Sequence, residues 1–319
     1  MREISYAQAV MEALHEEFRR DEKTVYMSTH IPAAFREEFG ESRVRATPIS
    51  ESAFVGAAIG LAGSGFRSVV NVRYAAFAFV AADQLANQAA KITYMFGGQA
   101  RFPIVYRMTA GAGKSMAAQH SVSPYPMYMN LPGLKISYPS TPYDAKGLLK
   151  TAIRDDNPVL FFEHVTLADM KGEVPVEEYT IPFGRAEVKK EGADVTVVAI
   201  ARMVHEALAA ADEMKEHGVS LEVIDPRTLV PLDIETIRTS VAKTGRLVVV
   251  DEACQTCGAA AEITSLVVEN VDTFNRLKAP PKRVCAFDIP IPYSPPMERY
   301  AVPNKERIVD AVKEAMANE

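Results

Sequence analysis

The sequence predicts an α/β protein built as two stacked α/β domains with largely parallel sheets. Short apolar runs alternate with helical stretches along the chain, a pattern typical of parallel strands covered by helices on both faces. The alternation stops in the polar segment 179–194, which is interrupted by Pro182, Gly184 and Gly192, and then starts again. We therefore expect a first domain over residues 1–184 and a second over residues 185–319.

The first domain is expected to open with an amphipathic helix. Ser5 and Gln8 form a capping-box pattern in front of it. The apolar periodicity predicts a buried face made of Ala7, Val10, Met11, Leu14 and Phe18. Further along, we expect helices within residues 81–96 and 141–156, and strands at SVVNV (68–72), FPIVYRM (102–108), LKISYPS (134–140) and VLFFEH (159–164).

The second domain repeats the alternation. A helix is predicted from Met203 to Glu216, because Gly218 stands just past its end, and another is expected to open at Asp233. Strands are expected at DVTVVAIA (194–201), LEVID (221–225), RLVVVDE (246–252) and RVCAFD (283–288).

Composition and charge limit the partners. With 319 residues, 48% of them hydrophobic and 24% charged, the chain can bury two globular cores. A net charge of -6 without a basic cluster makes nucleic acid an unexpected partner. The N-terminus MREISYAQAV is charged where a signal peptide needs an apolar core, and the uncharged run 53–66 is too short to span a bilayer. We expect a soluble, cytoplasmic protein with no membrane partner.

The three cysteines cannot form a disulfide framework. Cys254 and Cys257 form a CxxC, but no second CxxC or paired histidine supplies the further ligands that structural zinc needs. A redox dithiol and buried or incidental thiols remain the two interpretations, and the second is favoured.

Residues 108–115 read MTAGAGKS, one residue away from the GxxxxGKS loop that binds nucleotide phosphates. Met108 stands at the first required glycine, and Pro124 and Pro126 leave little room for the helix that would hold a phosphate. The pattern therefore disfavours a nucleotide hydrolase. The same stretch leads to His120, which follows a strand by a flexible turn where catalytic residues are common, although a lone histidine is usually structural.

Glu51 stands at the start of a helical segment without charge, in which Gly56 and Gly60 are four residues apart. A helix that is apolar all round is buried, and small residues let another backbone approach it. We therefore expect the Glu51 carboxylate to lie in a partly dry cleft with a raised pKa. The alternative is an ordinary first-turn acid favoured by the helix dipole.

The segment AIRDDNP (152–158) precedes the strand VLFFEH. Its carbonyl groups, with Asp155 and Asn157, offer the oxygen ligands that a hard cation prefers. An ordinary Asp-Asn-Pro turn explains the segment equally well.

Long motifs in chain order resemble the beta subunit of the thiamine diphosphate-dependent 2-oxo acid dehydrogenases, with the acetoin-type and pyruvate-type members nearest. The motifs cover essentially the whole chain and include TPISE, DQLANQAAK, AAQHS, STPYDAKGLLKTAIRDDNPV, DPRTLVPLD and VVVDEA. The resemblance implies a transketolase-like pyrimidine-binding domain followed by a transketolase C-terminal domain.

The resemblance also implies roles for single residues. Glu51, the glutamate of TPISE, would hydrogen-bond N1′ of the cofactor's aminopyrimidine, with Phe77 packing against that ring and Ile49 lining the same pocket. His120 would steer proton transfer to the substrate-derived intermediate or the acyl acceptor. In several relatives, a potassium ion is held by groups that match Ile104, Ala152, Ile153, Asp155 and Asn157.

The family binds magnesium and the diphosphate through a GDG…N motif, which these 319 residues lack. The resemblance therefore implies an alpha subunit that holds the magnesium and the diphosphate, in a heterotetramer of two alpha and two beta chains. It further implies an enzyme that decarboxylates a 2-oxo acid or cleaves acetoin and passes the acyl group to a lipoyl acyltransferase.

Two alternatives stand beside this activity. One is an acyloin ligase or transketolase-like enzyme without lipoyl transfer, and the other is a non-catalytic nucleotide-binding or scaffold subunit, which Met108 and Glu51 disfavour. Three departures from the family pattern leave the substrate and the acyl acceptor open: a short segment at residues 28–34, Ala76 and Val122.

Overall fold

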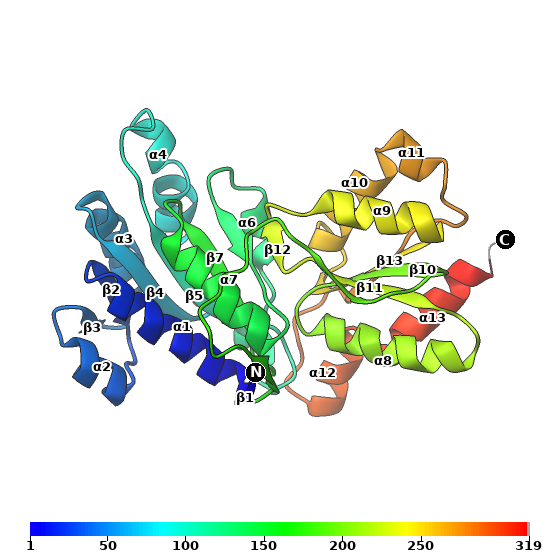
Figure 1. Ribbon diagram of the computed structural model, residues 1–319, viewed down its shortest axis with the longest axis horizontal. Helices are drawn as coiled ribbons and strands as arrows, with labels where there is room; N and C mark the ends of the chain where they lie inside the picture. The colour runs from blue at the N-terminus through cyan, green and yellow to red at the C-terminus, as the bar shows by residue number, and fades with distance from the viewer. Residues whose placement is uncertain (318–319) are drawn as a thin grey trace. The chain divides into compact units, whose positions relative to one another are not determined.

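The computed structural model describes residues 1–317, which form two compact units (Figure 1). The first unit contains residues 1–110 and 127–183, and the second contains Gly111–Pro126 and the chain from Gly184 onward. The division at Gly184 lies beside the boundary expected from the sequence. The segment Gly111–Pro126 differs, because it groups with the second unit although it interrupts the first.

The first unit contains a parallel sheet of six strands and a small antiparallel ribbon of two strands. Its strands and helices are, in chain order, β1 (Arg2–Ser5), α1 (Tyr6–Arg20), β2 (Thr24–Ser28), α2 (Ala33–Phe39), β3 (Val44–Ala46), α3 (Glu51–Gly63), β4 (Arg67–Tyr74), the 3-10 helix η1 (Ala75–Phe79), the π-helix η2 (Gln84–Ala89), α4 (Ile92–Met95), β5 (Ile104–Ala110), β6 (Lys135–Ser137), α7 (Pro142–Arg154), β7 (Val159–His164) and β8 (Lys171–Val174). The sheet runs in the order β6-β7-β5-β4-β2-β3 with parallel neighbours, while β1 pairs with β8 antiparallel. The carboxyl ends of the parallel strands therefore share one edge.

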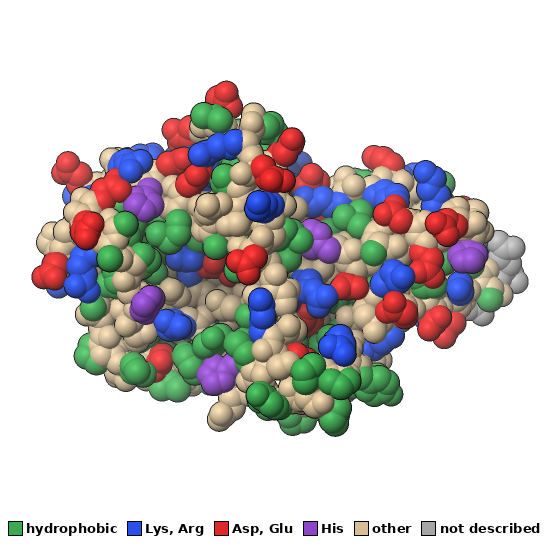
Figure 2. All heavy atoms as spheres, turned by 90° about the horizontal axis from the view of Figure 1, so that it is seen from below, with side chains coloured by type: hydrophobic (Ala, Val, Ile, Leu, Met, Phe, Trp, Pro, Cys, Tyr) green, Lys and Arg blue, Asp and Glu red, His purple; other side chains and the backbone are tan. Residues whose placement is uncertain are grey.

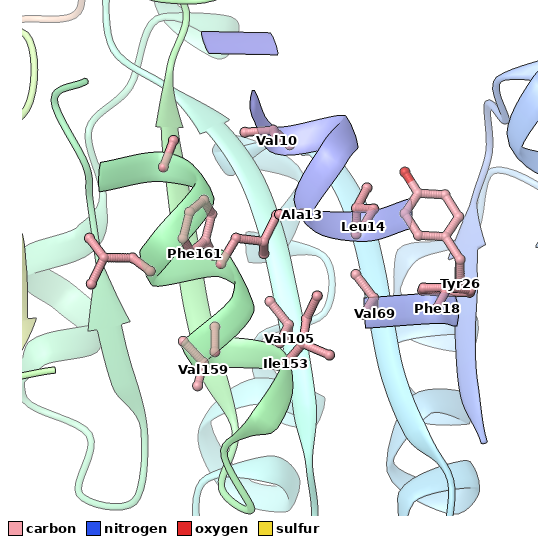
Figure 3. Packing of buried hydrophobic residues seen from close by; sticks show 14 of the residues in the cluster. Val10, Ala13, Leu14, Phe18, Tyr26, Val69, Val105, Ile153, Val159 and Phe161 are labelled. Atoms are coloured by element: carbon pink, nitrogen blue, oxygen red, sulfur yellow. The ribbon is translucent and has the colours of Figure 1, made fainter. Parts of the chain in front are cut away.

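Helices α1 and α7 cover one face of this sheet. A row of residues in register across four strands points at them, and it packs with α1 residues such as Leu14 and Phe18 (Figure 3). The row consists of Tyr26, Val69, Val105 and Val159. Since side chains alternate along a strand, Tyr106 points to the opposite face, where its hydroxyl donates to the Val55 carbonyl of α3 at 3.3 Å. Helix α3 thus lies on the other face.

The second unit contains a five-stranded sheet in the order β14-β13-β10-β11-β9, parallel except for the edge strand β9. Helices α8 and α13 pack on one face through residues such as Val197 and Val248. Thr196 points to the other face, where its hydroxyl lies 2.7 Å from that of Ser240 in α9. The elements are α5 (Ala117–His120), α6 (Tyr125–Met129, which runs into the first unit), β9 (Glu187–Lys190), β10 (Val195–Ala199), α8 (Met203–Glu216), β11 (Leu221–Asp225), β12 (Thr228–Val230), α9 (Ile234–Thr244), β13 (Leu247–Cys254), α10 (Ala259–Val268), α11 (Val271–Phe274), β14 (Lys282–Ala286), α12 (Pro295–Ala301) and α13 (Lys305–Met316).

One local prediction needed correction. Ala7 of α1 is exposed and Met11 only half-buried, because the buried face is centred on Ala9, Val10 and Ala13. The helical stretch expected within residues 81–96 is confirmed, and it consists of the π-helix η2 followed by the short α4.

Among residues 1–317, no helix combines the length and the apolar character needed to cross a bilayer.

Candidate active site

Glu51 is the first residue of α3, which follows the carboxyl end of β3. Its side chain is buried, with 8% of its surface exposed. Ser50 at the N-cap forms no side-chain hydrogen bond to the helix. Within residues 1–317, no group donates a hydrogen bond to the Glu51 carboxylate. The carboxylate is therefore a buried acceptor at the positive end of a helix, without a protein partner.

The helix that follows Glu51 is covered on one side only. Its residues Phe54, Val55 and Ala58 are buried, whereas Ala53 and Gly60 on another face are exposed. A Cβ built on Gly60 would meet no atom within 4 Å. From the sequence, we expected other parts of the protein to bury every side of this helix. That expectation is wrong for the face that carries Ala53 and Gly60, which nothing among residues 1–317 covers.

Phe77 lies in η1, directly after the carboxyl end of β4, and its ring is half-buried. Its ring meets that of Tyr74 edge to face, with centroids 5.6 Å apart and planes at 90°. The end of η1 is tied to α3, because the Ser52 hydroxyl donates to the Val80 carbonyl at 2.7 Å. Phe77 and Glu51 therefore belong to adjoining segments at one edge of the sheet.

Ile49 lies in the turn before Glu51 and is 84% exposed. Val80, whose carbonyl accepts from Ser52, is 62% exposed. The surroundings of Glu51 thus combine a buried carboxylate with apolar side chains at the surface. Such a mixture suits a ligand that is flat and apolar with a few polar atoms.

His120 is the last residue of the short helix α5 and is half-buried within the second unit. The glycine-rich turn before it does not present free amides to a phosphate. Glu298 accepts hydrogen bonds from the amides of Gly113 and Ser115, at 2.8 and 3.0 Å, and Glu252 accepts from the amide of Ala112. Because these donors are occupied by carboxylates of the chain itself, the geometry argues against a nucleotide-phosphate loop.

Several polar residues at these places had not been singled out from the sequence. The hydroxyls of Ser121 and Ser123, beside His120, are buried without a hydrogen-bond partner, as is the side-chain oxygen of Gln84 in η2. His30 lies exposed just beyond the carboxyl end of β2. The strand β2, TVYMS, was itself not recognised; with it in place, the position of His30 after a buried strand would have drawn attention.

The groups expected to hold potassium lie around the end of α7. The carbonyls of Ile153 and Asp155 both accept from the same nitrogen of Arg67, Nη1, at 3.2 and 3.0 Å, so these two oxygens face one positively charged point. The Asp155 carboxylate accepts from Lys135 and, at 2.8 Å, from the side-chain amide of Asn157. The carbonyl oxygens of Ile153 and Asp155 therefore face a point where a monovalent cation could bind, but the guanidinium of Arg67 already occupies that point.

Ile104 and Ala152, the two other residues expected around this ion, are buried. Over residues 1–317, no three His, Cys, Asp or Glu side chains are grouped so that they could hold a metal ion.

The CxxC cysteines, Cys254 and Cys257, are exposed rather than buried. Partial burial of its thiol and the nearby negative charge of Asp288 raise the pKa of Cys254 above the ordinary value of 9.0. A reactive dithiol needs a lowered thiol pKa, so the raised pKa of Cys254 agrees better with incidental thiols than with a redox dithiol. Burial also raises the pKa of Cys285, to about 12.

The two units match two known domain families. Residues 2–170 match the transketolase pyrimidine-binding domain, and residues 184–308 match the transketolase C-terminal domain. The sequence is 42% identical to the beta subunit of acetoin:2,6-dichlorophenolindophenol oxidoreductase of Bacillus subtilis (strain 168), over 99% of this chain and 98% of that protein. The chain belongs to the beta-subunit family of the acetoin and 2-oxo acid dehydrogenases. Members of this family are thiamine diphosphate-dependent.

Two further members of the beta-subunit family, both from B. subtilis, are similar to this chain. The beta subunit of 2-oxoisovalerate dehydrogenase is 41% identical, over 98% of both chains, and the beta subunit of the pyruvate dehydrogenase E1 component is 39% identical, over 99% of both. These identities are nearly equal to the 42% found with the beta subunit of the acetoin oxidoreductase. Overall sequence similarity therefore does not show which of the three substrates this chain's enzyme uses.

A solved structure, a split-gene transketolase described as an inactive beta4 tetramer, matches 99% of both chains with a TM-score of 0.82 at 22% identity. It shows the same fold. The two α/β domains and the family expected from the motifs are thus confirmed.

Proposed function

We propose that this chain is the beta subunit of an enzyme that uses thiamine diphosphate to decarboxylate a 2-oxo acid or cleave acetoin and passes the acyl group to a lipoyl carrier. The observation that carries the proposal is Glu51, a buried carboxylate without a partner among residues 1–317, at the edge of the sheet that also bears Phe77. The similarity to three beta subunits over nearly the full chain supports it.

The residues at this edge fit the aminopyrimidine half of the cofactor. When bound, thiamine diphosphate supplies a nucleophilic thiazolium carbon, the chemistry that this chain's own side chains lack. Glu51 holds a proton at the pyrimidine N1′, since its carboxylate is buried and has no competing donor. Phe77 offers a half-buried aromatic ring for packing, and Ile49 an exposed apolar side chain. His120 acts as the proton donor toward the substrate.

An alpha subunit completes the proposed site by holding magnesium and the diphosphate. The chain has no GDG…N segment, and it leaves apolar surface exposed. Tyr94, Met95 and Phe96 around α4 are 87%, 74% and 57% exposed. Figure 2, a view that does not face α4, shows further groups of hydrophobic side chains at the surface. Large exposed apolar groups are typical of protein interfaces. We propose that the enzyme assembles from two alpha and two beta chains and acts with a lipoyl acyltransferase in the cytoplasm.

Calorimetry tests the half-site. With magnesium present, the isolated chain should bind thiamine diphosphate negligibly, whereas the complex with its alpha subunit should bind it tightly. Micromolar binding by the isolated chain would contradict the proposal.

A second experiment, on the assembled enzyme, identifies the substrate and the acceptor of the acyl group. Acetoin, pyruvate and 2-oxoisovalerate are each offered with an artificial electron acceptor, and then with a lipoyl domain or with an aldehyde. Transfer to the lipoyl domain supports the proposed activity. Transfer to the aldehyde alone would favour the acyloin ligase.

We also propose a potassium site formed by Ile104, Ala152, Ile153, Asp155 and Asn157. Because Arg67 already donates to two of its carbonyls, potassium is expected to raise the melting temperature only slightly in the wild type and more in Arg67→Met. Thermal unfolding in potassium chloride and in choline chloride measures this. Equal melting temperatures in both salts for both proteins would reject the site.

A further inference from the structure

The glycine-rich turn GAGKS binds an anion that comes from the protein itself. Gly111, Gly113 and Ser115 have positive φ angles of 93°, 109° and 54°, and the amides of Gly113 and Ser115 both donate to one carboxylate. The Glu298 carboxylate accepts from the Gly113 amide at 2.8 Å, from the Ser115 amide at 3.0 Å and from the Ser115 hydroxyl at 3.2 Å. Glu298 lies in α12 and is 2% exposed.

Two further acids of the second unit hold the same loop. Glu252 accepts from the amide of Ala112 at the start of the loop. Asp251 accepts from the hydroxyl of Tyr125 near its end, and both of these side chains are fully buried. Carboxylates from β13 and α12 thus contact the segment Gly111–Pro126 at its beginning, its turn and its end.

The loop also contains strained backbone close to His120. Ser115 and Ala117, neither of them glycine, have φ angles of 54° and 60°. Such conformations are unfavourable for residues with a side chain and persist only where surrounding contacts hold them. Ala117 is the first residue of α5, which ends at His120. Only Met116 and one helical turn therefore separate Ser115 from the histidine.

We propose that Glu298 is a positioning residue whose carboxylate fixes the loop Gly111–Pro126 in the conformation that presents His120. This inference rests on the proposed role of His120 and names the group that supports it. Glu298 touches no reacting atom; it acts through the Gly113 and Ser115 amides.

The test compares Glu298→Gln with the wild type in the assembled enzyme. Glutamine keeps the shape of the side chain but replaces one acceptor oxygen by a donor, so part of the amide contact is lost. We expect faster hydrogen exchange in peptides that cover residues 111–117 and faster tryptic cleavage after the exposed Lys114. Turnover should fall about tenfold or more, while KM and thiamine diphosphate affinity stay within about twofold, as for loss of a residue that orients a proton donor.

Two further variants separate positioning from general damage. Ser115→Ala removes only the hydroxyl contact and should give an intermediate effect on exchange and turnover. Glu306→Gln on α13, whose side chain is 71% exposed, should change neither. In a His120→Ala background, Glu298→Gln should lower turnover no further, because its effect acts through the missing imidazole.

Unchanged exchange and cleavage in Glu298→Gln would overturn the proposal, and so would additive losses of turnover in the double variant. Faster exchange with unchanged turnover would overturn the link to His120. If His120→Ala alone keeps full activity, the proposed role of the histidine is wrong. Hydrogen exchange and tryptic cleavage of Glu298→Gln would still test whether Glu298 holds the loop.

Discussion

The ammonium group of Lys150 lies 2.6 Å from the carboxylate of Glu16, although the lysine side chain is only 1% exposed. Lys146, fully buried one turn earlier on α7, lies 2.7 Å from the other oxygen of the same carboxylate. Glu12 and Glu178 approach the two lysines at 3.2 and 3.7 Å. Between α1 and α7, two buried lysines thus meet partly exposed carboxylates, and Glu16 contacts both lysines at once.

Replacing Glu16 by Gln should destabilise the protein, because two buried ammonium groups lose their shared partner. We expect a loss of about 1–3 kcal/mol, below the range for a fully isolated charge because Glu12 and Glu178 remain. Urea unfolding measures this. Glu41→Gln, which breaks an exposed pair with Arg36, is the control and should change little. Equal stabilities of the Glu16 variant and the wild type would show that these ion pairs contribute nothing.

The same carboxylate predicts a pH dependence. Burial opposes its ionisation, but hydrogen bonds and charge from Lys146 and Lys150 outweigh burial and hold the pKa of Glu16 below its ordinary value of 4.5. The folded pKa is depressed, so the stabilisation is complete above the unfolded pKa and is lost as pH falls through the folded value. The stability difference between wild type and Glu16→Gln should therefore be constant from about pH 7 to 5.5 and shrink below about pH 4.5. A difference that instead vanished on raising the pH would contradict the assignment.

Glu51→Gln keeps the shape of the side chain but removes its capacity to hold and return a proton. Turnover of the assembled enzyme should fall by roughly two to four orders of magnitude, the range for loss of a general acid–base. Melting temperature and assembly with the alpha subunit should stay near wild type, and both need to be measured beside turnover. If the turnover of this variant is within about threefold of wild type, Glu51 is an ordinary first-turn acid that only interacts with the helix dipole.

Lys114→Ala and His120→Ala decide the role of the stretch MTAGAGKS. Lys114 is exposed and Glu298 occupies the amides beside it, so its loss should change turnover by less than about tenfold. Loss of His120 should leave thiamine diphosphate affinity nearly normal and lower turnover by roughly a hundredfold or more. Affinity and acyl transfer are measured for both variants with the alpha subunit. An inactive lysine variant beside an active histidine variant would reverse the assignment.

Local sequence signals were sufficient for much of the fold. Helix α8 occurs at the predicted Met203–Glu216, because apolar periodicity and Gly218 mark both its face and its end. Strands β1 and β8, each four residues long and largely exposed, carry no apolar alternation and could not be recognised. The π-helical geometry of Gln84–Ala89 was equally hidden, since a π-helical segment of six residues is too short to show a period of its own.

The candidate site was only partly accessible to sequence reasoning. Glu51 and His120 stand in motifs that mark them, and their roles remain predictions. The contact of Glu298 with Gly113 joins residues 185 positions apart, and that of Glu252 with Ala112 joins residues 140 apart. Pairs so distant leave no local pattern. The sequence therefore shows the glycine turn but not the acid that occupies it.

The loop Gly111–Pro126 interrupts the first unit yet belongs to the second, and this constrains recombination between family members. A chimaera joined near residue 184 would inherit the loop from one parent and Asp251, Glu252 and Glu298 from the other. Parents that share these three acids keep their contacts with the loop when halves are exchanged. If the parents differ at these acids, a viable hybrid requires additional crossovers on both sides of the loop. The loop and the three acids that contact it then come from the same parent.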